Sequence, residues 1–261
     1  MKFYFLKICL FLPYLIHAQF NYVAHRGASF LAPENTCASI NLAWKMGVKA
    51  AECDVMITKD SQVVVFHDKT TGRLLEKNYK IKETDYKEFK DLSIELTNNN
   101  LPKFKGEKVP LLKDLLINLP DSVTLVIEIK CGTEILNPLK KVLNNYWKTG
   151  NLSFISFGYK TIMAIKKAFP EIPCYFLAHM KMDINKRIDE LLKGPLDGID
   201  LNHKIINNNL VNKFNKFGKD IWCYTVDSPK IAHRMINLGV NGITTNRPKW
   251  LKDVLNSKTF K

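Results

Sequence analysis

The chain lacks the sequence features that mark several protein classes. Beyond the first twenty residues, no run approaches ~20 uninterrupted apolar residues, so a membrane-spanning mature protein is not expected. The six cysteines include no C-x-x-C pair, which argues against a zinc site and against a dense disulfide framework. A glycine-rich dinucleotide fingerprint is also absent. These absences disfavour an integral membrane protein, a zinc protein and an open doubly wound sheet.

The charge is strongly basic but is not concentrated in any segment. Lys+Arg total 39 and Asp+Glu total 25, which gives a net charge of +14. The basic residues are scattered, with no arginine-rich tract and no alternation with aromatic residues, so nucleic-acid binding is not expected. The surface charge instead favours anionic substrates or peripheral contact with anionic lipid. A hydrophobic content of 46% and a charged content of 25% in 261 residues indicate a packed globular protein rather than a disordered one.

The first eighteen residues have the order of a secretory signal peptide. Lys2 and Lys7 precede a mostly apolar run over residues 8–16, and the small Ala18 suits the last position before cleavage. We therefore expect residues 1–18 to be a signal peptide and the protein to be exported, either periplasmic or extracellular. The alternative is that the apolar run forms a buried strand or helix of a cytoplasmic protein. Five cysteines would remain after cleavage, and the sequence leaves any disulfide pairing among them open.

From Asn21 onward, short β-rich runs alternate with amphipathic segments. The expected strands are 22–24, 50–57, 63–66, 123–129, 154–156, 174–177, 198–201, 221–226 and 242–244. The expected helices are 36–46, 135–147, 160–168, 185–192 and 230–238. Roughly eight strand–helix units in ~240 residues predict an α/β protein with a (β/α)8 TIM barrel over residues 19–261. Residues 70–109 break the alternation and are expected to form a polar insertion, with a weak helical signal near residues 85–92.

Three acidic residues fall at or inside expected strands. Glu52 and Asp54 are two residues apart, which on a strand places both side chains on one face about 6.5–7 Å apart. Glu128 lies in the very apolar run 123–129. Buried carboxylates without compensation are costly, and a bound cation would stabilise all three. Oxygen ligands of this kind suit a hard ion, Mg²⁺ or Ca²⁺, although pairing with Arg26 or Lys130 is the simpler alternative for any single acid.

Two histidines and two basic residues lie beside the same strand ends. His25 and His67 can serve as acid or base because imidazole titrates near neutrality. Arg26 suits bidentate phosphate binding, and Lys130 acts as a point charge. Because the carboxyl ends of barrel strands converge on one face, we expect these side chains to surround one anion-binding metal site. The remaining histidines are expected to be ordinary core or surface residues: His17, His179, His203 and His233.

Short motifs along the chain together resemble the glycerophosphodiester phosphodiesterase family in order and spacing. They are HRGA at 25–28, PENT at 33–36, ECDV at 52–55, TKD at 58–60, VVFHD at 64–68 and EIK at 128–130. Further similarity lies in VPL at 109–111, SF at 156–157, YTVD at 224–227 and GVNGITTNRP at 239–248. The resemblance covers essentially the whole mature chain, and the combined set is far more specific than its histidine-arginine-glycine triplet alone.

The resemblance implies a TIM barrel, dependence on one divalent cation, and hydrolysis of glycerophosphodiesters to glycerol phosphate and an alcohol. The matching positions are Glu52, Asp54 and Glu128 for the metal, His25 and His67 for proton transfer, and Arg26 and Lys130 for phosphate. Glu34 and Asn35 are expected to support these residues or to cap the helix over 36–46 rather than to act in catalysis.

The chain departs from the family pattern at three positions. Ser61 stands where a turn glycine is usual, which is expected to matter only locally. Tyr224 stands where a tryptophan is common, so this expected substrate-binding residue leaves the shape of the pocket open. Asn246 replaces the usual aspartate near the end of the last strand, and we expect it to alter a local hydrogen bond rather than the chemistry.

Two other functions are compatible with the sequence. One is a phospholipase-like phosphodiesterase in which a hydroxyl of the substrate attacks and gives a cyclic phosphate. The other is a non-catalytic exported barrel that binds phosphodiesters or an anionic surface. A binding protein has no need for two proton-transfer histidines beside a metal site, so hydrolysis is favoured.

Overall fold

Eight parallel strands close into a barrel in the computed structural model, which describes residues 21–95 and 102–257. The expected signal peptide over residues 1–18 lies outside the described residues. The sheet order is β1-β9-β8-β7-β6-β5-β4-β2, and pairing of β1 with β2 closes it. The strands are β1 (Asn21–Ala24), β2 (Ala50–Ile57), β3 (Val63–Val65), β4 (Thr124–Ile129), β5 (Asn151–Ser156), β6 (Cys174–Ala178), β7 (Gly198–Asn202), β8 (Asp220–Tyr224) and β9 (Gly242–Thr245). Short β3 is antiparallel to β2 and lies outside the closed ring.

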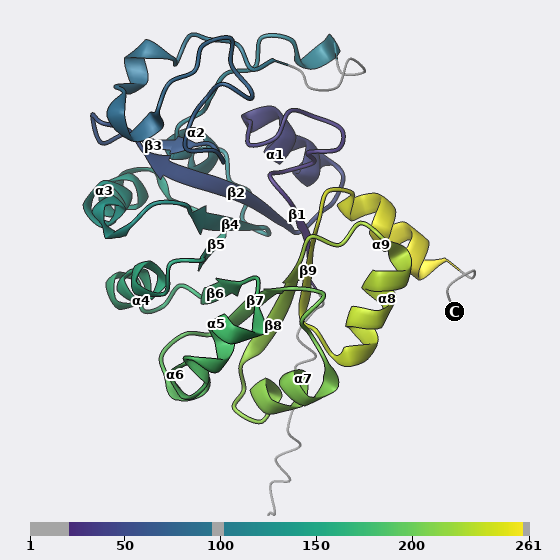
Figure 1. Ribbon diagram of the computed structural model, residues 1–261. Helices are drawn as coiled ribbons and strands as arrows, with labels where there is room; N and C mark the ends of the chain where they lie inside the picture. The colour runs from purple at the N-terminus through teal and green to yellow at the C-terminus, as the bar shows by residue number, and fades with distance from the viewer. Residues whose placement is uncertain (1–20, 96–101, 258–261) are drawn as a thin grey trace, which may run out of the picture.

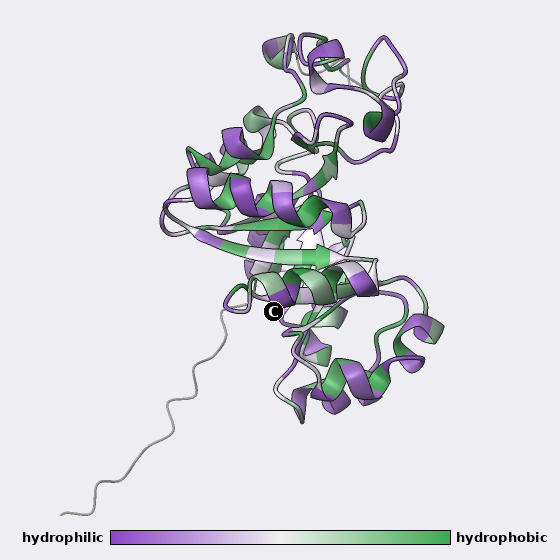
Figure 2. Cartoon of the chain, turned by 90° about the vertical axis from the view of Figure 1, so that its left-hand side faces the viewer, coloured by the Kyte–Doolittle hydropathy of each residue, from purple (hydrophilic) through white to green (hydrophobic). Residues whose placement is uncertain are grey.

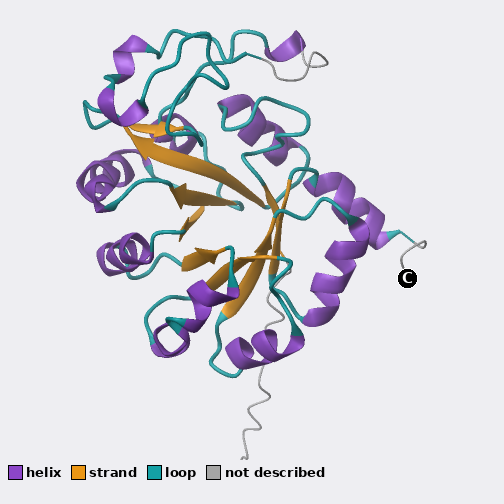
Figure 3. Ribbon diagram, viewed as in Figure 1, coloured by secondary structure: helices purple, strands orange, loops and turns teal. Residues whose placement is uncertain are grey.

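Helices surround the barrel and complete the strand–helix alternation (Figures 1 and 3). They are α1 (Cys37–Lys45), α2 (Leu112–Leu116), α3 (Leu136–Tyr146), α4 (Tyr159–Ala168), α5 (Lys181–Asn185), α6 (Ile188–Lys193), α7 (Asn208–Asn215), α8 (Pro229–Leu238) and α9 (Pro248–Asn256). The TIM barrel expected from the sequence is therefore confirmed. Within residues 21–95 and 102–257, none of the helices has the length and apolar character needed to cross a bilayer.

Two apolar layers hold the barrel together. The larger one fills the space between the strands and the surrounding helices, so the strands of Figure 2 are mainly hydrophobic while the helices carry one hydrophobic side. The smaller one fills the barrel interior: Val23, Ala50, Val126, Ile155, Tyr175, Leu177 and Trp222. The five cysteines of the described part are all free thiols.

The helices differ from expectation in two ways. The expected helix over 185–192 is two short helices, α5 and α6, because Arg187 between them has the non-helical angles φ −132° and ψ 17°. The sequence pattern did not predict α2, α7 or α9. Helix α7 is rich in asparagine, a weak helix former, and begins where the Asn207 side chain accepts a hydrogen bond from the Leu210 amide.

The insertion after β3 is a packed unit rather than an open loop. Three 3₁₀ turns lie along it, η1 (Ile81–Glu83), η2 (Tyr86–Glu88) and η3 (Pro102–Phe104), and the second takes the place of the expected helix near 85–92. Its own apolar core packs onto β2 and β3, and Figure 1 shows it covering that side of the barrel. The core residues are Met56, Val64, Phe66, Leu74, Leu75, Ile81, Phe89, Ile94, Val109 and Leu111.

The turn between β2 and β3 explains why glycine is usual at position 61. Ser61 has φ +62°, in the left-handed region that favours glycine, and its amide donates to the Thr58 carbonyl at 3.0 Å. A left-handed conformation costs a residue with a side chain about 1–2 kcal/mol. Glycine avoids this cost, but it also gives the unfolded chain more conformational entropy, which offsets part of the gain in stability. We therefore expect Ser61→Gly to raise the free energy of unfolding by about 0.5–1 kcal/mol in urea titrations. Ser61→Ala keeps the strained backbone and is the control. Equal stability of the two variants would contradict this account.

Candidate active site

Three acids meet at the carboxyl end of the barrel interior. Glu52 and Asp54 come from β2 and Glu128 from β4, and the Cα atoms of Asp54 and Glu128 are paired in register. One carboxylate oxygen from each lies within 4.8 Å of the others. Their exposed fractions are 1%, 1% and 9%. The structure therefore brings together the three residues expected to hold a metal.

The three carboxyl groups do not titrate alike. Burial, followed by the charges of Asp54 and Glu128, holds the pKa of Glu52 well above its usual value. Burial and Asp54 raise the pKa of Glu128 to about 7, against the opposing charge of Lys130. Burial also acts on Asp54, but Arg26 and Lys130 outweigh it and hold the pKa of Asp54 below its usual value. Without a cation, the cluster therefore keeps one firm negative charge and two carboxyl groups that resist ionisation.

Two basic side chains border the acids. Lys130 Nζ donates to Glu128 Oε1 at 2.8 Å and lies 3.5 Å from Asp54 Oδ1. Arg26 Nε lies 3.2 Å from Asp54 Oδ2, and the Arg26 amide donates to Glu52 Oε2 at 2.8 Å. Pairing of acids with bases, the simpler alternative for a single acid, therefore does occur for Asp54 and Glu128. Glu52 Oε1, however, is buried and has no hydrogen-bond partner in the part of the chain that the structure describes.

The backbone around Arg26 is held in an unusual conformation. Arg26 has φ +53° and Gly27 has φ +77°. A Cβ on Gly27 would lie 2.5 Å from the backbone carbon of Ser39, so α1 approaches too closely for any other residue. The Ser39 hydroxyl donates to the Arg26 carbonyl at 2.9 Å. This packing aims the Arg26 amide at Glu52.

Asn35 supports the acid cluster and does not cap α1, which settles one of the two roles that the sequence left open for it. Thr36 is the N-cap of α1, with its hydroxyl accepting from the Ser39 amide at 3.0 Å. Asn35, at φ +57°, instead holds Asp54: its Nδ2 donates to Asp54 Oδ2 at 2.8 Å and its Oδ1 accepts from the Asp54 amide at 3.0 Å. Asn35 therefore fixes the orientation of one acid of the cluster.

His25 is tethered by an asparagine. Its Nδ1 lies 2.8 Å from Asn246 Oδ1. Asn246 Nδ2 donates to Asp227 Oδ2 at 2.6 Å, and the Asn246 amide donates to Asp227 Oδ1 at 2.8 Å. Because a carboxylate can only accept, Asn246 must point its amide nitrogen at Asp227 and its oxygen at His25. Burial, then Arg26, lowers the pKa of His25, while Asn246 and Asp54 oppose that change.

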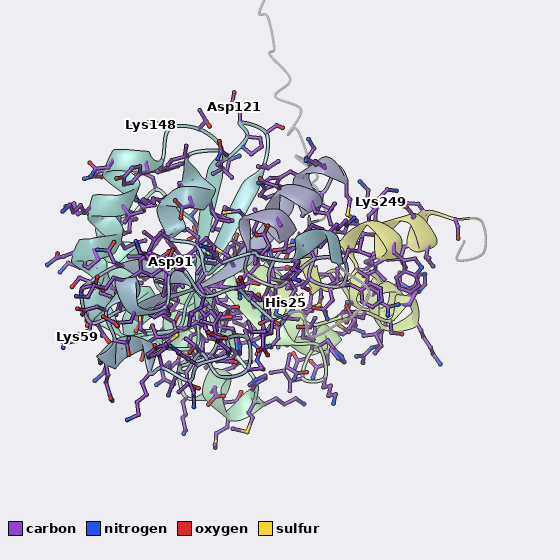
Figure 4. The ribbon with its side chains drawn as sticks, turned by 90° about the horizontal axis from the view of Figure 1, so that it is seen from above. His25, Lys59, Asp91, Asp121, Lys148 and Lys249 are labelled. Atoms are coloured by element: carbon purple, nitrogen blue, oxygen red, sulfur yellow. The ribbon has the colours of Figure 1, made fainter. Side chains whose placement is uncertain are left out.

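His67 is tethered by a carboxylate. Its Nδ1 lies 2.5 Å from Oδ1 of Asp68, the next residue. His67 is near enough to the acids that its charge is one of the causes that lower the pKa of Asp54. Seen from above in Figure 4, His25 lies within the body of the molecule, whereas Lys59, Lys148 and Lys249 lie at its periphery.

Comparison with known proteins identifies the family to which the chain belongs. The model of the Glycerophosphoryl diester phosphodiesterase family matches residues 25–250. The chain belongs to this family. It is 31% identical to the glycerophosphodiester phosphodiesterase of Caldanaerobacter subterraneus subsp. tengcongensis, over 88% of this chain and 95% of that protein. It is 28% identical to the glycerophosphodiester phosphodiesterase of Bacillus subtilis, over 87% of this chain and 83% of that protein.

Solved structures agree with this assignment. A phosphodiesterase of Oleispira antarctica in complex with the product sn-glycerol-3-phosphate superposes with a TM-score of 0.83 at 26% identity, covering 91% of this chain and 97% of that chain. A glycerophosphodiester phosphodiesterase of Thermotoga maritima has the same fold, with a TM-score of 0.74 at 22% identity, covering 91% of this chain and 99% of that chain. The protein is thus a phosphoric diester hydrolase of the glycerophosphodiester phosphodiesterase family.

An aromatic wall borders the acids on the side of β5, β6 and β8. The ring centroids of Phe157 and His179 are 5.1 Å apart, those of Phe157 and Tyr224 5.9 Å, and those of His179 and Tyr224 5.5 Å. Tyr224 donates to the Ala178 carbonyl at 3.0 Å, and Lys130 Nζ lies 5.9 Å from the Phe157 ring. In this family member the wall contains a tyrosine and a histidine, and sequence reasoning had placed His179 among the ordinary residues.

Sequence reasoning named Asp68 and Asn246 within motifs but missed the contacts by which the two histidines are held. Asn246 was expected to alter only a local hydrogen bond, whereas that bond is made to His25 itself. Arg73, which binds Asp68, lies in the insertion and had no motif of its own. No spacing rule finds either residue, because Asn246 is 221 positions from His25 and the insertion has no regular period.

A fourth buried acid, Asp200 on β7, lies in the barrel interior and is 1% exposed. Within residues 21–95 and 102–257, neither of its carboxylate oxygens has a hydrogen-bond partner. Burial and then Glu128 hold the pKa of Asp200 well above its usual value, and the Leu201 amide offsets only part of this. A folded-state pKa above the unfolded one means that the folded protein loses stability as pH rises above about 4.

We expect Asp200→Asn to stabilise the protein at neutral pH, by at least about 1 kcal/mol, because an amide has no charge to lose. At pH 4 the gain should be much smaller, since Asp200 is then protonated in the folded state and about half protonated in the unfolded state. Urea unfolding at the two pH values measures both differences. An equal gain at both pH values would mean that packing, rather than the carboxyl charge, causes it.

Proposed function

We propose that this protein hydrolyses glycerophosphodiesters to glycerol phosphate and an alcohol, with one divalent cation and two histidines. The observation that carries the proposal is the juxtaposition of three buried acids within 4.8 Å with two cationic side chains and two separately tethered imidazoles. The product named for the Oleispira antarctica structure, sn-glycerol-3-phosphate, supports the same reaction class.

The donor set fits a hard cation. Glu52, Asp54 and Glu128 offer only oxygen atoms, which suit Mg²⁺ or Ca²⁺. Glu52 Oε1, buried and without a hydrogen-bond partner, is an acceptor that a cation would satisfy. When bound, the cation would supply positive charge that stabilises a phosphoryl oxygen in the transition state.

Arg26 and Lys130 bind the phosphate. Both are already paired with acids of the cluster, so their positive groups are held at its edge before substrate arrives. Positioned charges of this kind stabilise a developing negative charge without reorganising during the reaction. Tyr224 and the aromatic wall contact the organic part of the substrate.

The two tethers give the histidines different roles. The fixed oxygen of Asn246 requires a proton on His25 Nδ1, which leaves Nε2 of the neutral ring as an acceptor. The lowered pKa of His25 keeps that ring neutral, and His25 therefore takes the proton from the attacking water. His67 has a carboxylate behind it, which suits a ring that gives a proton to the departing alcohol oxygen.

The proposal is tested with a substrate panel and the protein lacking residues 1–18. Glycerophosphocholine, glycerophosphoethanolamine and a chromogenic phosphodiester are incubated with and without Mg²⁺ or Ca²⁺, and the products are followed by phosphorus NMR. Glycerol phosphate without a transient cyclic diester is expected. A cyclic product would establish the phospholipase-like alternative, and no turnover of any substrate with either ion would revive the binding-protein alternative.

We also propose export to the periplasm or the outside, on the order of charged, apolar and small residues over 1–18. N-terminal sequencing of the mature protein from its native host should begin at Gln19. Recovery of the intact chain from the cytoplasm would refute this. Peripheral contact with anionic lipid stays a prediction from the net charge alone.

A further inference from the structure

Arg73 connects the insertion to two acids at the mouth of the barrel. Its Nε donates to Asp68 Oδ2 at 2.5 Å. Its Nη2 donates to Glu34 Oε1 at 2.6 Å, and its Nη1 donates to Glu34 Oε2 at 3.2 Å. The planar guanidinium thus binds two carboxylates at once, an arrangement that a lysine ammonium does not reproduce.

The contact with Asp68 determines how His67 is held. Asp68 uses one oxygen for Arg73 and the other for His67 Nδ1, the latter at 2.5 Å. A carboxylate bound on both oxygens has little freedom to rotate, so its orientation and that of the imidazole are fixed together. Partners of this kind set the tautomer and direction of a histidine ring without touching the substrate.

The backbone around Arg73 is fixed by the packing of the insertion. The next two residues, Leu74 and Leu75, are 3% and 2% exposed and pack in the insertion's own core. Their amides donate to the Thr71 carbonyl at 3.0 and 2.9 Å. The Leu74 carbonyl accepts from the Glu95 amide at 2.7 Å. The backbone at Arg73 is therefore fixed, although its side chain is 41% exposed.

We propose that Arg73 is a positioning residue for His67 and that the insertion takes part in catalysis through it. The inference rests on the proposed function, in which His67 transfers a proton. A second route is open to Arg73, because Glu34 also accepts from Arg26 Nη1 at 2.9 Å. A route through Glu34 would act on phosphate binding, whereas the route through Asp68 acts on His67 alone.

A double-mutant cycle separates the two routes. Arg73→Gln, His67→Ala and the double variant are assayed on glycerophosphocholine with the cation that supports activity. We expect Arg73→Gln to lower kcat by about 10- to 100-fold with little change in KM. In the His67→Ala background, Arg73→Gln should lower kcat by less than about twofold, because the imidazole that Arg73 positions is absent. Arg73→Lys keeps the positive charge but cannot bind both carboxylates as the planar guanidinium does. Its kcat should lie between those of wild type and Arg73→Gln.

Lys82→Gln is the matched control. Lys82 also joins the insertion to the barrel, but through Glu134 at 3.1 Å rather than through Asp68, so the kcat of the variant should equal that of wild type. Unchanged kcat in Arg73→Gln, or the same loss with and without His67, would overturn the positioning role. Should circular dichroism show that Arg73→Gln is unfolded, the cycle with Arg73→Lys gives the same reading. A wild-type rate for His67→Ala would instead refute the two-histidine mechanism, which distinguishes the two failures.

Discussion

Chelation of divalent cations should reduce phosphodiester hydrolysis by at least about 1000-fold, since a cation at a phosphoryl oxygen contributes several kcal/mol to the transition state. Activity should return on addition of Mg²⁺ or Ca²⁺, and the ion that restores it at the lower concentration identifies the cofactor. Glu128→Gln should show a comparable loss that added metal does not repair, because the amide removes a charged ligand from the three-acid cluster. Steady-state rates across a metal titration give both results.

Loss of activity in Glu128→Gln should not reflect unfolding. In the metal-free protein the buried acids repel one another, so a neutral amide relieves repulsion rather than creating it. Metal should raise the melting temperature of the wild type, by the equivalent of about 2.7 kcal/mol at 100 times Kd, and leave that of Glu128→Gln nearly unchanged. Asp253→Asn, which alters a surface ion pair with Lys249 on α9, is the control for loss of a carboxylate. Full activity in the presence of a chelator would remove the metal from the mechanism.

Metal binding should weaken as the pH falls below about 7. The pKa of Glu128 is raised to about 7 in the metal-free cluster, and a carboxylate must lose its proton to bind a cation. The apparent affinity should therefore drop by up to about tenfold per pH unit for each proton displaced. The sign for folding follows from the same shift: the metal-free protein loses stability as pH rises from about 4.3 to 7, because the folded state keeps a proton that the unfolded state releases. Calorimetric titrations with metal at pH 6 and pH 8 measure the first effect.

The barrel was predictable because its strands are buried on both faces and so appear as short apolar runs. Strand β2 (Ala50–Ile57) has the bounds that its sequence pattern indicated, and all eight of its residues are buried. The acids were visible for the opposite reason, since Glu52 and Asp54 interrupt that run at a spacing of two. A charged residue inside a buried strand is conspicuous in any sequence.

The contacts of Asn246 with His25 and of Arg73 with Asp68 were not predictable, because they form only through tertiary packing. Asn246, which is held by Asp227, reaches His25 only once β9 has paired with β1. Arg73 reaches Asp68 from an insertion whose conformation depends on its own small core. Ser61 lies between these cases: its departure from glycine was visible in the sequence, but its left-handed φ required the structure. The sequence therefore identified the reactive side chains but not the contacts that hold them in place.

His25→Ala and His67→Ala should each slow turnover of glycerophosphocholine by about 10²- to 10⁴-fold, the usual contribution of a general acid or base. Both variants should keep the wild-type fold by circular dichroism, since neither ring lies in the apolar core. His233→Ala is the control, because that ring is exposed on α8, where its Nδ1 lies 3.2 Å from Asn237 Nδ2. A wild-type rate in either active-site variant would remove that histidine from the mechanism.

The leaving group then decides which histidine is the acid. A p-nitrophenolate departs without taking up a proton, so the p-nitrophenyl ester of glycerol phosphate needs a base but no acid. With this ester the loss in His67→Ala should shrink to a few-fold, while the loss in His25→Ala should stay as large as with glycerophosphocholine. The asymmetry follows from the partners of the two rings: the amide oxygen of Asn246 keeps Nε2 of His25 free to accept, and the carboxylate of Asp68 behind His67 suits a proton donor. The reverse pattern, with His25→Ala rescued and His67→Ala not, would exchange the two roles and show that these tethers do not set them.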